Sequence, residues 1–315
     1  MNDNILESFF TLLRIGLWGG DPGEMHLSSD EWLDLYALSR RQTVQGVMLD
    51  AILKLPPEAG FPAYLKDRWT REQELLVARY DRIAGIVKIQ EDAWRNRGIN
   101  AVQIKGQTVA VMYPEPKHRL CGDIDWWLPT EDDWRRALSV VLENGCRTET
   151  DSDGDLHYVL GGIMVEHHRH GLEAEGPEGI MLMLNMHILH HVMVAGVGLR
   201  QICDLAMAYD FHKESIPAYR ALVKEKGLEA WTEALDELVT SLKEGEGPMA
   251  LEGRAAALLD LVLEDGNFGL DKDFRFGCFH KRASLLLRLV PGRFISTWAG
   301  LVRGRLRRFF GQSLS

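Results

Sequence analysis

The sequence predicts an α+β fold in which a small mixed β-sheet lies between an N-terminal and a C-terminal helical region. Two changes in pattern indicate this fold. Apolar residues follow helical spacing over residues 1–97 and again from residue 177, whereas short apolar runs bounded by Gly, Asn and Asp turns fill the stretch between. We therefore divide the chain into an N-terminal helical region (1–97), an α/β core (98–176) and a C-terminal helical region with a basic tail (177–315).

The N-terminal region is predicted to contain two well-defined helices. The first covers residues 29–53, because Ser28 or Ser29 can cap it and Glu31 lies in its first turn. The second covers about residues 62–96 and is rich in Arg, Glu and Gln. Two consecutive prolines separate these helices, because proline cannot continue a helix.

Short elements are predicted in the core, and longer ones after it. Apolar runs and turn residues predict strands over 99–104, 122–128, 146–150, 156–160 and 163–168, and helices over 106–113 and 130–142. Helices are then expected over 177–195, 199–214, 217–226, 228–242 and 251–264, with 243–248 as a linker.

Composition excludes several classes of protein. The four cysteines are scattered without CxxC spacing, which argues against a zinc ribbon or a disulfide scaffold and favours a cytoplasmic location. No uncharged run reaches the roughly 18 residues of a membrane-spanning helix. The chain is acidic overall, with a net charge of −10.

The basic residues are unevenly distributed. From Phe274 to the C-terminus there are Arg and Lys side chains but no Asp or Glu, so the basic tail (275–308) contrasts with an acidic body. This asymmetry predicts an electrostatic task for the tail. It would dock on the acidic body of its own chain, bind RNA, or contact a membrane surface or a partner.

The most informative motif is a glycine turn followed by two spaced aspartates. Residues 105–108 (Lys-Gly-Gln-Thr) lie between a predicted strand and a predicted helix, and Asp123 and Asp125 lie on the next strand. Residues i and i+2 of a strand point to the same face, so both carboxylates are expected in one small volume while Ile124 points into the core. A third carboxylate, Glu166, lies on a later strand.

Carboxylates that converge beside a glycine turn match the needs of a divalent cation and a nucleotide. Mg²⁺ takes oxygen ligands and shares the rest of its shell with substrate phosphates. A turn at Gly106 lets backbone N–H groups approach a phosphate, and the following helix offers its N-terminus to the negative charge. The alternative is an ordinary edge strand with solvated acids.

These residues also resemble a known superfamily. A strand, a Gly turn and a helix, followed by an Asp-x-Asp strand and a later carboxylate, is the layout of the DNA polymerase β-like nucleotidyltransferases. More specifically, the chain resembles the bacterial family called uncharacterised nucleotidyltransferases, and residues 12–19 and 41–44 resemble Bacteroides-type members. The motifs that carry the likeness are Ile104-Lys105-Gly106, Tyr113-Pro114-Glu115-Pro116, Arg119, Gly122-Asp123-Ile124-Asp125, Glu166 with His168, His190-His191, and Leu199-Arg200 with Asp204.

The resemblance implies a nucleotidyltransferase core and a role for each motif. Asp123, Asp125 and Glu166 would be the catalytic residues and would hold two Mg²⁺ ions, or Mn²⁺, with general-base action as the alternative for Glu166. The residues that would bind the NTP are Lys105, Gly106, Gln107, Arg119, His168, Arg200 and Asp204. The reaction would transfer an NMP from the NTP to a hydroxyl acceptor and release pyrophosphate.

Several of these residues also have purely structural interpretations. Lys105 and Arg119 could each pair with Asp123 or Glu115 instead of a phosphate. The three histidines at 187, 190 and 191 share one face of a predicted helix, where packing is the simpler interpretation.

Two more observations qualify the resemblance. Arg200 and Asp204 have the spacing of an ordinary helix ion pair. At the turn, Gln107 stands where the superfamily has Gly or Ser, and Cys121 replaces a Ser, so the phosphate cradle departs from the usual pattern.

The sequence leaves the acceptor open between a small molecule and a macromolecule such as tRNA or a protein. A function of a different class is a non-catalytic nucleotide- or partner-binding module that retains the fold. The intact acids at 123, 125 and 166 argue against that alternative.

Overall fold

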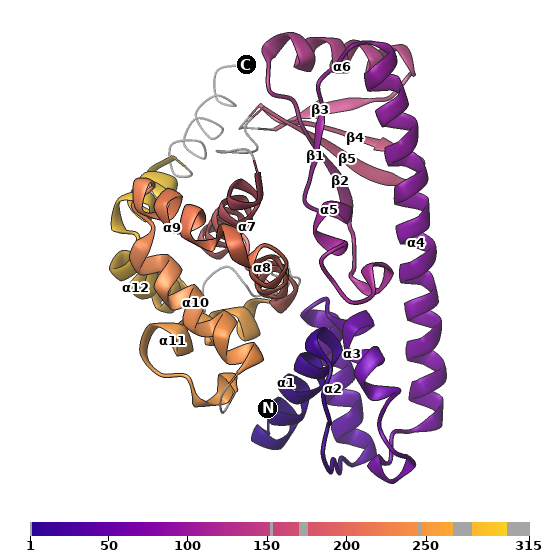
Figure 1. Cartoon of the computed structure of the whole chain (residues 1–315), viewed down its shortest axis with the longest axis vertical. Helices are drawn as coiled ribbons and strands as arrows, with labels where there is room; N and C mark the ends of the chain where they lie inside the picture. The colour runs from indigo at the N-terminus through magenta and orange to yellow at the C-terminus, as the bar shows by residue number, and fades with distance from the viewer. Residues whose placement is uncertain (1, 152–153, 170–175, 245–246, 267–278, 301–315) are drawn as a thin grey trace, which may run out of the picture.

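The computed structural model describes residues 2–151, 154–169, 176–244, 247–266 and 279–300 (Figure 1). Helices predominate and enclose one small mixed sheet, which confirms the predicted α+β class. None of the helices in these ranges combines the length and apolar character that crossing a membrane requires.

The N-terminal region is helical, as predicted, and ends in a long helix. Its elements are α1 (Asp3–Trp18), α2 (Ser29–Arg41), α3 (Gln45–Ile52), the 3₁₀ turn η1 (Pro57–Ala59) and α4 (Ala63–Asn96). Ser28 caps α2, and the Glu31 side chain accepts from the Ser28 backbone in return, a capping box that fixes where the helix begins. Figure 1 shows α4 running along one whole side of the molecule.

The single helix predicted over 29–53 is wrong, because the structure has two. Thr43 adopts a left-handed backbone, with φ of 55°, and separates α2 from α3. The preceding residue, Gln42, is fully buried and bonds the C-terminal region through its amide: its Nε2 donates to the Val262 oxygen at 3.1 Å and its Oε1 accepts from the Leu199 N–H at 2.9 Å. These contacts join residues far apart in the sequence, so the residues around position 42 do not predict them. They lie where the helix is interrupted between α2 and α3.

The core contains the five predicted strands. In chain order its elements are β1 (Val102–Ile104), α5 (Gln107–Ala110), η2 (Pro116–His118), β2 (Asp123–Trp127), α6 (Glu131–Glu143), β3 (Thr148–Thr150), β4 (Leu156–Leu160) and β5 (Ile163–His168). The strand order is β1-β2-β5-β4-β3. The central pair β2–β5 is parallel and the other pairs are antiparallel, so the sheet is mixed.

The two faces of the sheet have different surroundings. One face packs against α4 and α6 in a core formed by Ile83, Trp94, Ile124, Trp126, Val141 and Val165, among others. Because strand residues alternate between faces, burying Ile124 and Trp126 directs Asp123 and Asp125 to the opposite face. That face looks towards the C-terminal helices (Figure 1).

The C-terminal region is helical and shares a core with the N-terminal helices. Its elements are α7 (Gly176–Val194), α8 (Leu199–Phe211), η3 (Lys213–Ser215), α9 (Ile216–Glu225), α10 (Glu229–Lys243), η4 (Pro248–Ala250), α11 (Gly253–Asp265) and α12 (Phe279–Leu289). Phe9, Trp32, Leu182, Leu205 and Trp231 belong to this one apolar core. Residues 245–246 of the predicted linker lie outside the described ranges.

The described part of the basic tail docks on the chain's own acidic body. Arg282 of α12 forms a buried ion pair with Asp265, with 2.6 Å between Nη2 and Oδ2. Lys281 pairs with Glu264 beside it, and Leu286 is fully buried. Five further basic residues of the tail, at 275, 303, 305, 307 and 308, lie outside the described residues.

Candidate functional site

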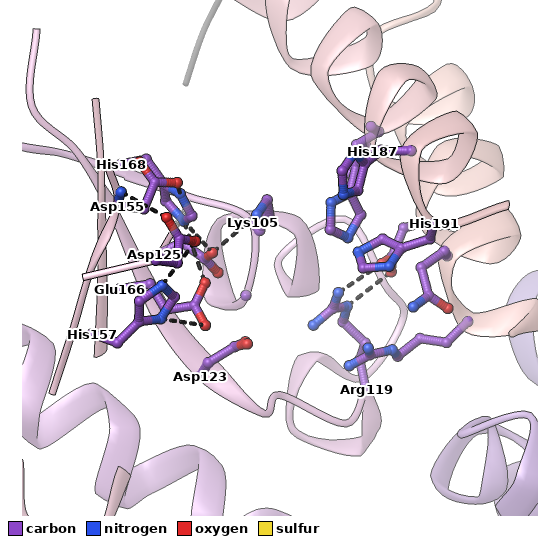
Figure 2. Close-up of a pocket in the computed structure, with 17 residues that line it drawn as sticks. Lys105, Arg119, Asp123, Asp125, Asp155, His157, Glu166, His168, His187 and His191 are labelled. Carbon is purple, nitrogen blue, oxygen red and sulfur yellow. Dashed lines mark hydrogen bonds and ion pairs between the residues drawn. The ribbon is translucent and has the colours of Figure 1, made fainter. Parts of the chain in front are cut away.

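The register of the sheet brings the predicted acids together. Asp125 of β2 lies beside Glu166 of β5, and Glu166 in turn lies beside His157 of β4. All three side chains therefore project from the same face, across three neighbouring strands. Figure 2 shows them gathered on one side of a cavity.

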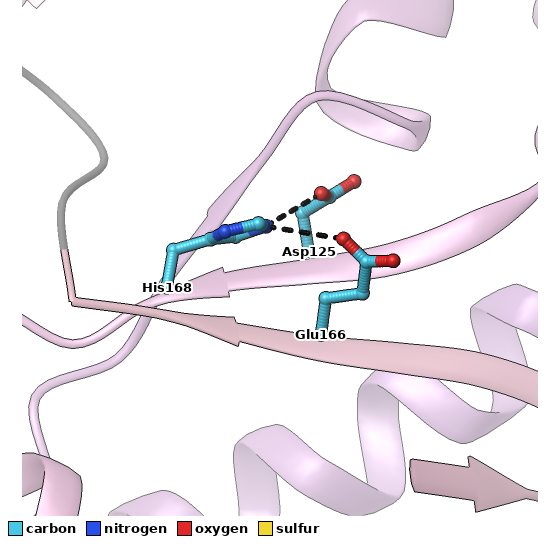
Figure 3. A group of neighbouring side chains, drawn as sticks. All are labelled: Asp125, Glu166 and His168. Carbon is cyan, nitrogen blue, oxygen red and sulfur yellow. Dashed lines mark hydrogen bonds and ion pairs between the residues drawn. The ribbon is translucent and has the colours of Figure 1, made fainter. Parts of the chain in front are cut away.

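Three side chains on this face lie close enough together to be a candidate metal site (Figure 3). One ligand atom each from Asp125, Glu166 and His168 lies within 4.8 Å of the others. Asp123 lines the same cavity but is not part of this group. The structure thus brings together two of the three predicted metal ligands beside His168, which the sequence predicted as a nucleotide-binding residue.

The pKa values of the three acids are shifted in opposite directions. Burial alone would raise the pKa of Asp125, but the ammonium of Lys105 and the hydrogen bond from His168 lower it to about 2. Burial raises the pKa of Glu166, and repulsion from Asp125 and Asp123 raises it further. Burial and the neighbouring Asp125 also raise the pKa of Asp123. Such mutual repulsion is relieved by a bound cation, so these side chains fit a divalent metal.

His168 is fixed by carboxylates at both ring nitrogens. Its Nε2 lies 2.8 Å from Asp125 Oδ1, and its Nδ1 lies 2.7 Å from Asp155 Oδ2. Burial opposes a charge on the ring, but the hydrogen bonds to the two aspartates outweigh it and raise the pKa of His168 to about 9. His167, the neighbouring residue on β5, points to the opposite face, where its Nε2 lies 2.9 Å from the Tyr158 hydroxyl.

Sequence reasoning missed Asp151, Asp155 and His157. The His157 ring lies between two acids, with Nδ1 3.3 Å from Glu166 Oε1 and Nε2 3.2 Å from Asp151 Oδ2. The signal that could have found Asp155 and His157 is the alternation of polar side chains at positions 155 and 157 where β4 begins, because residues i and i+2 of an extended chain point to the same face.

At the glycine turn, the side chain of Lys105 points into the cavity and that of Gln107 does not. Lys105 donates from Nζ to Asp125 Oδ1 at 3.0 Å, rather than to Asp123 or Glu115. The Gln107 side chain is buried and donates to the Tyr80 oxygen at 3.0 Å, so it is directed towards α4 and not into the cavity. The helix that follows, α5, has only four residues, so the expected contribution of its N-terminus to phosphate binding is small.

Arg119 and Asp204 form a buried pair at the cavity wall. Arg119 donates from Nε to Asp204 Oδ1 at 2.8 Å and from Nη2 to Oδ2 at 2.6 Å. The Tyr113 hydroxyl also donates to this carboxylate, at 2.7 Å. The pairing of Arg119 with Asp123 or Glu115, considered from the sequence, is therefore wrong, and so is the pairing of Asp204 with Arg200.

Arg200, unlike Arg119, bonds a backbone oxygen instead of a carboxylate. Its Nη1 donates to the Leu120 oxygen at 2.7 Å, and no carboxylate in the described part of the chain lies within ion-pair distance of it. Its Nε is buried and has no hydrogen-bond partner among the described residues. Arg200 therefore retains donors for a ligand in the cavity that it lines.

The wall opposite the acids comes from α7. His187, His190 and His191 line the cavity, and Figure 2 shows His187 and His191 facing the strand acids across it. Burial lowers the pKa of His187 well below its usual value, and it lowers that of His191 to about 3. The cavity measures about 410 Å³, within the usual range for small-molecule sites.

The comparison with protein families decides the class of this site. Residues 28–180 match the model of a family described as uncharacterised nucleotidyltransferase. This part of the chain belongs to that family. The nucleotidyltransferase region includes the glycine turn and all three predicted acids, and it makes the protein a transferase of phosphorus-containing groups. No curated protein and no solved structure matches the chain.

The family match ends within α7, at residue 180. The three cavity histidines, Arg200 and Asp204 lie beyond it. The cavity of this nucleotidyltransferase thus has one wall that the family model covers and one wall that it does not.

Proposed function

We propose that the protein is a divalent-cation-dependent enzyme that transfers an NMP from an NTP to a hydroxyl acceptor. The observation that carries this proposal is the parallel pairing of β2 with β5, which puts Asp125 beside Glu166 in a polar cavity next to the Lys105–Gly106 turn. A cation held there would neutralise the negative charge of the phosphates and make the acceptor hydroxyl more acidic.

In this proposal each side chain has a defined task. Asp125 and Glu166 hold the cation, with Asp123 at the edge of the same site; two Mg²⁺ ions, or Mn²⁺, suit such oxygen ligands. His168 orients Asp125 by its short hydrogen bond. Glu166 is alternatively the base, because its raised pKa suits it to accept the proton of the acceptor hydroxyl.

The NTP is proposed to lie between the two walls of the cavity. The backbone N–H groups at Gly106 and Gln107, the Lys105 ammonium and the Arg200 guanidinium face the triphosphate. Arg119 and Asp204 shape the wall behind it through their mutual pair. The acceptor oxygen attacks the α-phosphorus, the bond to the β-phosphate breaks, and pyrophosphate leaves.

The acceptor is a small molecule or a macromolecule such as tRNA or a protein, and the protein acts in the cytoplasm. A tRNA acceptor would use the basic tail, so removing residues 293–315 would lower tRNA affinity. Unchanged affinity would favour the other acceptors.

The first test is transfer of label from each α-³²P-NTP, with Mg²⁺ or Mn²⁺, to a mixture of total tRNA and cell lysate. We expect a labelled product with the wild type, and a loss of at least 100-fold with Asp125→Asn or Asp123→Asn, because a metal ligand is removed. NTP binding without transfer to any acceptor would favour the non-catalytic nucleotide-binding module. Transfer that survives Asp125→Asn would show that the metal site is assigned wrongly.

A further inference from the structure

The carboxylate best placed to bind a cation already carries two positively charged donors. Asp125 is almost completely buried, with 2% of its surface exposed. Its Oδ1 accepts from Lys105 Nζ at 3.0 Å and from His168 Nε2 at 2.8 Å. One of the two carboxylate oxygens that Asp125 could offer to a metal is therefore already occupied by positively charged side chains of the protein.

The two donors differ in how firmly they are held. The second ring nitrogen of His168 is fixed by Asp155 at 2.7 Å, so the imidazole is anchored on both sides. The Lys105 ammonium has Asp125 as its partner within the described chain, and its side chain is 20% exposed to the cavity. A lysine stem has four rotatable bonds, so Lys105 can leave Asp125 while His168 stays.

The backbone holds Lys105 in an unusual conformation. Its φ is +59°, in the left-handed region that a residue with a Cβ enters at a cost of about 1–2 kcal/mol, and φ at Gly106 is +51°. Thr108 stabilises this turn: its backbone N–H and its hydroxyl both donate to the Lys105 oxygen, at 3.0 and 2.6 Å. The fold thus maintains a strained turn that directs the lysine stem to the acids.

We propose that Lys105 is an internal counter-ion, which occupies the cation position on Asp125 in the nucleotide-free protein and moves to the triphosphate when a divalent cation binds. This inference rests on the proposed function and concerns the regulation of the same site. The lysine weakens the binding of a cation alone and strengthens the binding of a cation with nucleotide. The two ligands are therefore coupled, and the site assembles fully only with both.

The test uses two binding measurements on the full chain. Mn²⁺ alone is titrated into nucleotide-free protein and followed by the EPR signal of free Mn²⁺, and α,β-methylene-ATP with Mg²⁺ is titrated by calorimetry. For Lys105→Met we expect Mn²⁺ to bind at least tenfold more tightly and the nucleotide analogue at least tenfold more weakly. These opposite signs separate a counter-ion from a residue that merely supports the fold.

Two variants serve as controls. Lys105→Arg keeps the charge, so Mn²⁺ affinity should remain low. Lys117→Met removes a surface lysine that pairs with Asp81 at 2.8 Å, and it should change neither affinity. Thermal melts of each variant check that the chain is folded.

A labelling experiment on the wild type needs no variant. The reactivity of the Lys105 amine towards acetic anhydride, measured by mass spectrometry, should rise when Mg²⁺ is added and fall again when α,β-methylene-ATP is also present. A reactivity that Mg²⁺ leaves unchanged would contradict the proposal.

Asp125→Asn separates failure of this inference from failure of the proposed function. If Asp125→Asn abolishes Mn²⁺ binding but Lys105→Met leaves it unchanged or weaker, the metal site stands and the counter-ion is refuted. If Mn²⁺ binds equally to wild type and Asp125→Asn, the metal site and the counter-ion are both refuted.

Discussion

Among single residues, Arg119 shows how a buried charge defines the cavity wall. Arg119 is 6% exposed, and two of its guanidinium donors bond the two oxygens of Asp204. Such a pair adds little to the free energy of unfolding compared with apolar residues of the same volume. Removing one partner, however, leaves the other charge buried and uncompensated. The pair therefore fixes the geometry of the wall more than it adds stability.

We predict that Asp204→Asn lowers the free energy of unfolding by about 3–5 kcal/mol, because the Arg119 charge loses its partner. The double variant Arg119→Met with Asp204→Leu should lose less than Asp204→Asn alone. Urea denaturation followed by circular dichroism measures both. Glu143→Gln, in the exposed pair with Arg97, is the control and should change little. A larger loss in the double variant would show that the pair is a net stabiliser.

Single residues also mark the limit of what the sequence predicts about this site. The Asp-x-Asp spacing is enough to place Asp123 and Asp125 on one face, because strand periodicity is local. The partner of Arg119 cannot be predicted in this way, since Asp204 is 85 positions away, on α8. The unexpected direction of Gln107 has the same origin, because its amide meets the Tyr80 oxygen of α4.

Among the helices and strands, the sequence pattern predicted correctly those whose bounds are set by neighbouring residues in the chain. The strands over 156–160 and 163–168 were predicted to the residue, because a Gly-Gly turn joins two alternating runs. The helix predicted over 29–53 failed where Gln42 bonds distant backbone groups. The parallel pairing of β2 with β5, on which the site depends, also joins segments far apart in the sequence.

Close packing of α1 on α3 gives a prediction about glycine. A Cβ added at Gly16 would lie 2.3 Å from the backbone oxygen of Val47, which cannot move without moving α3. Gly16→Ala should therefore lower the free energy of unfolding by about 1–3 kcal/mol. Gly85 in α4 has open space at the same atom, so Gly85→Ala should raise it by about 0.5–1 kcal/mol. Thermal or urea denaturation compares the two, and a Gly16→Ala protein as stable as wild type would contradict the packing.

At the scale of the whole molecule, the site lies where separate parts of the chain meet. The acids come from the sheet, whose other face is covered by α4 and α6, and the facing histidines come from α7. Helices from both ends of the chain share the core behind α7. The cavity therefore exists only in the fully folded chain, and its buried groups contribute to global stability.

The histidines of α7 make the stability of the folded chain dependent on pH. His187 and His191 are held neutral first by burial and then by the nearby charges of Lys105 and Arg200 and by His190, while Asp125 opposes this effect at His191. The pKa of His191 falls from 6.5 to about 3. In the unfolded chain both side chains are exposed to water and titrate normally.

We predict that the native chain loses stability as pH falls from about 6.5 towards 5. In this window the unfolded chain takes up a proton at each of these two histidines, and at the buried His167, whose pKa burial lowers to about 3, while the folded chain does not. Protonation therefore favours unfolding. The free energy of unfolding should drop by about 1.4 kcal/mol per pH unit for each histidine once pH is well below 6.5. His191→Asn should remove about one such contribution and His187→Asn a second, as measured by urea midpoints across pH 5–8, while the contribution of His167 remains. His26→Asn, at an exposed position, should leave the pH profile unchanged. If His191→Asn leaves the slope of unfolding free energy against pH unchanged, His191 takes up its proton in the folded chain. The conclusion that the cavity wall facing the acids is neutral would then be wrong.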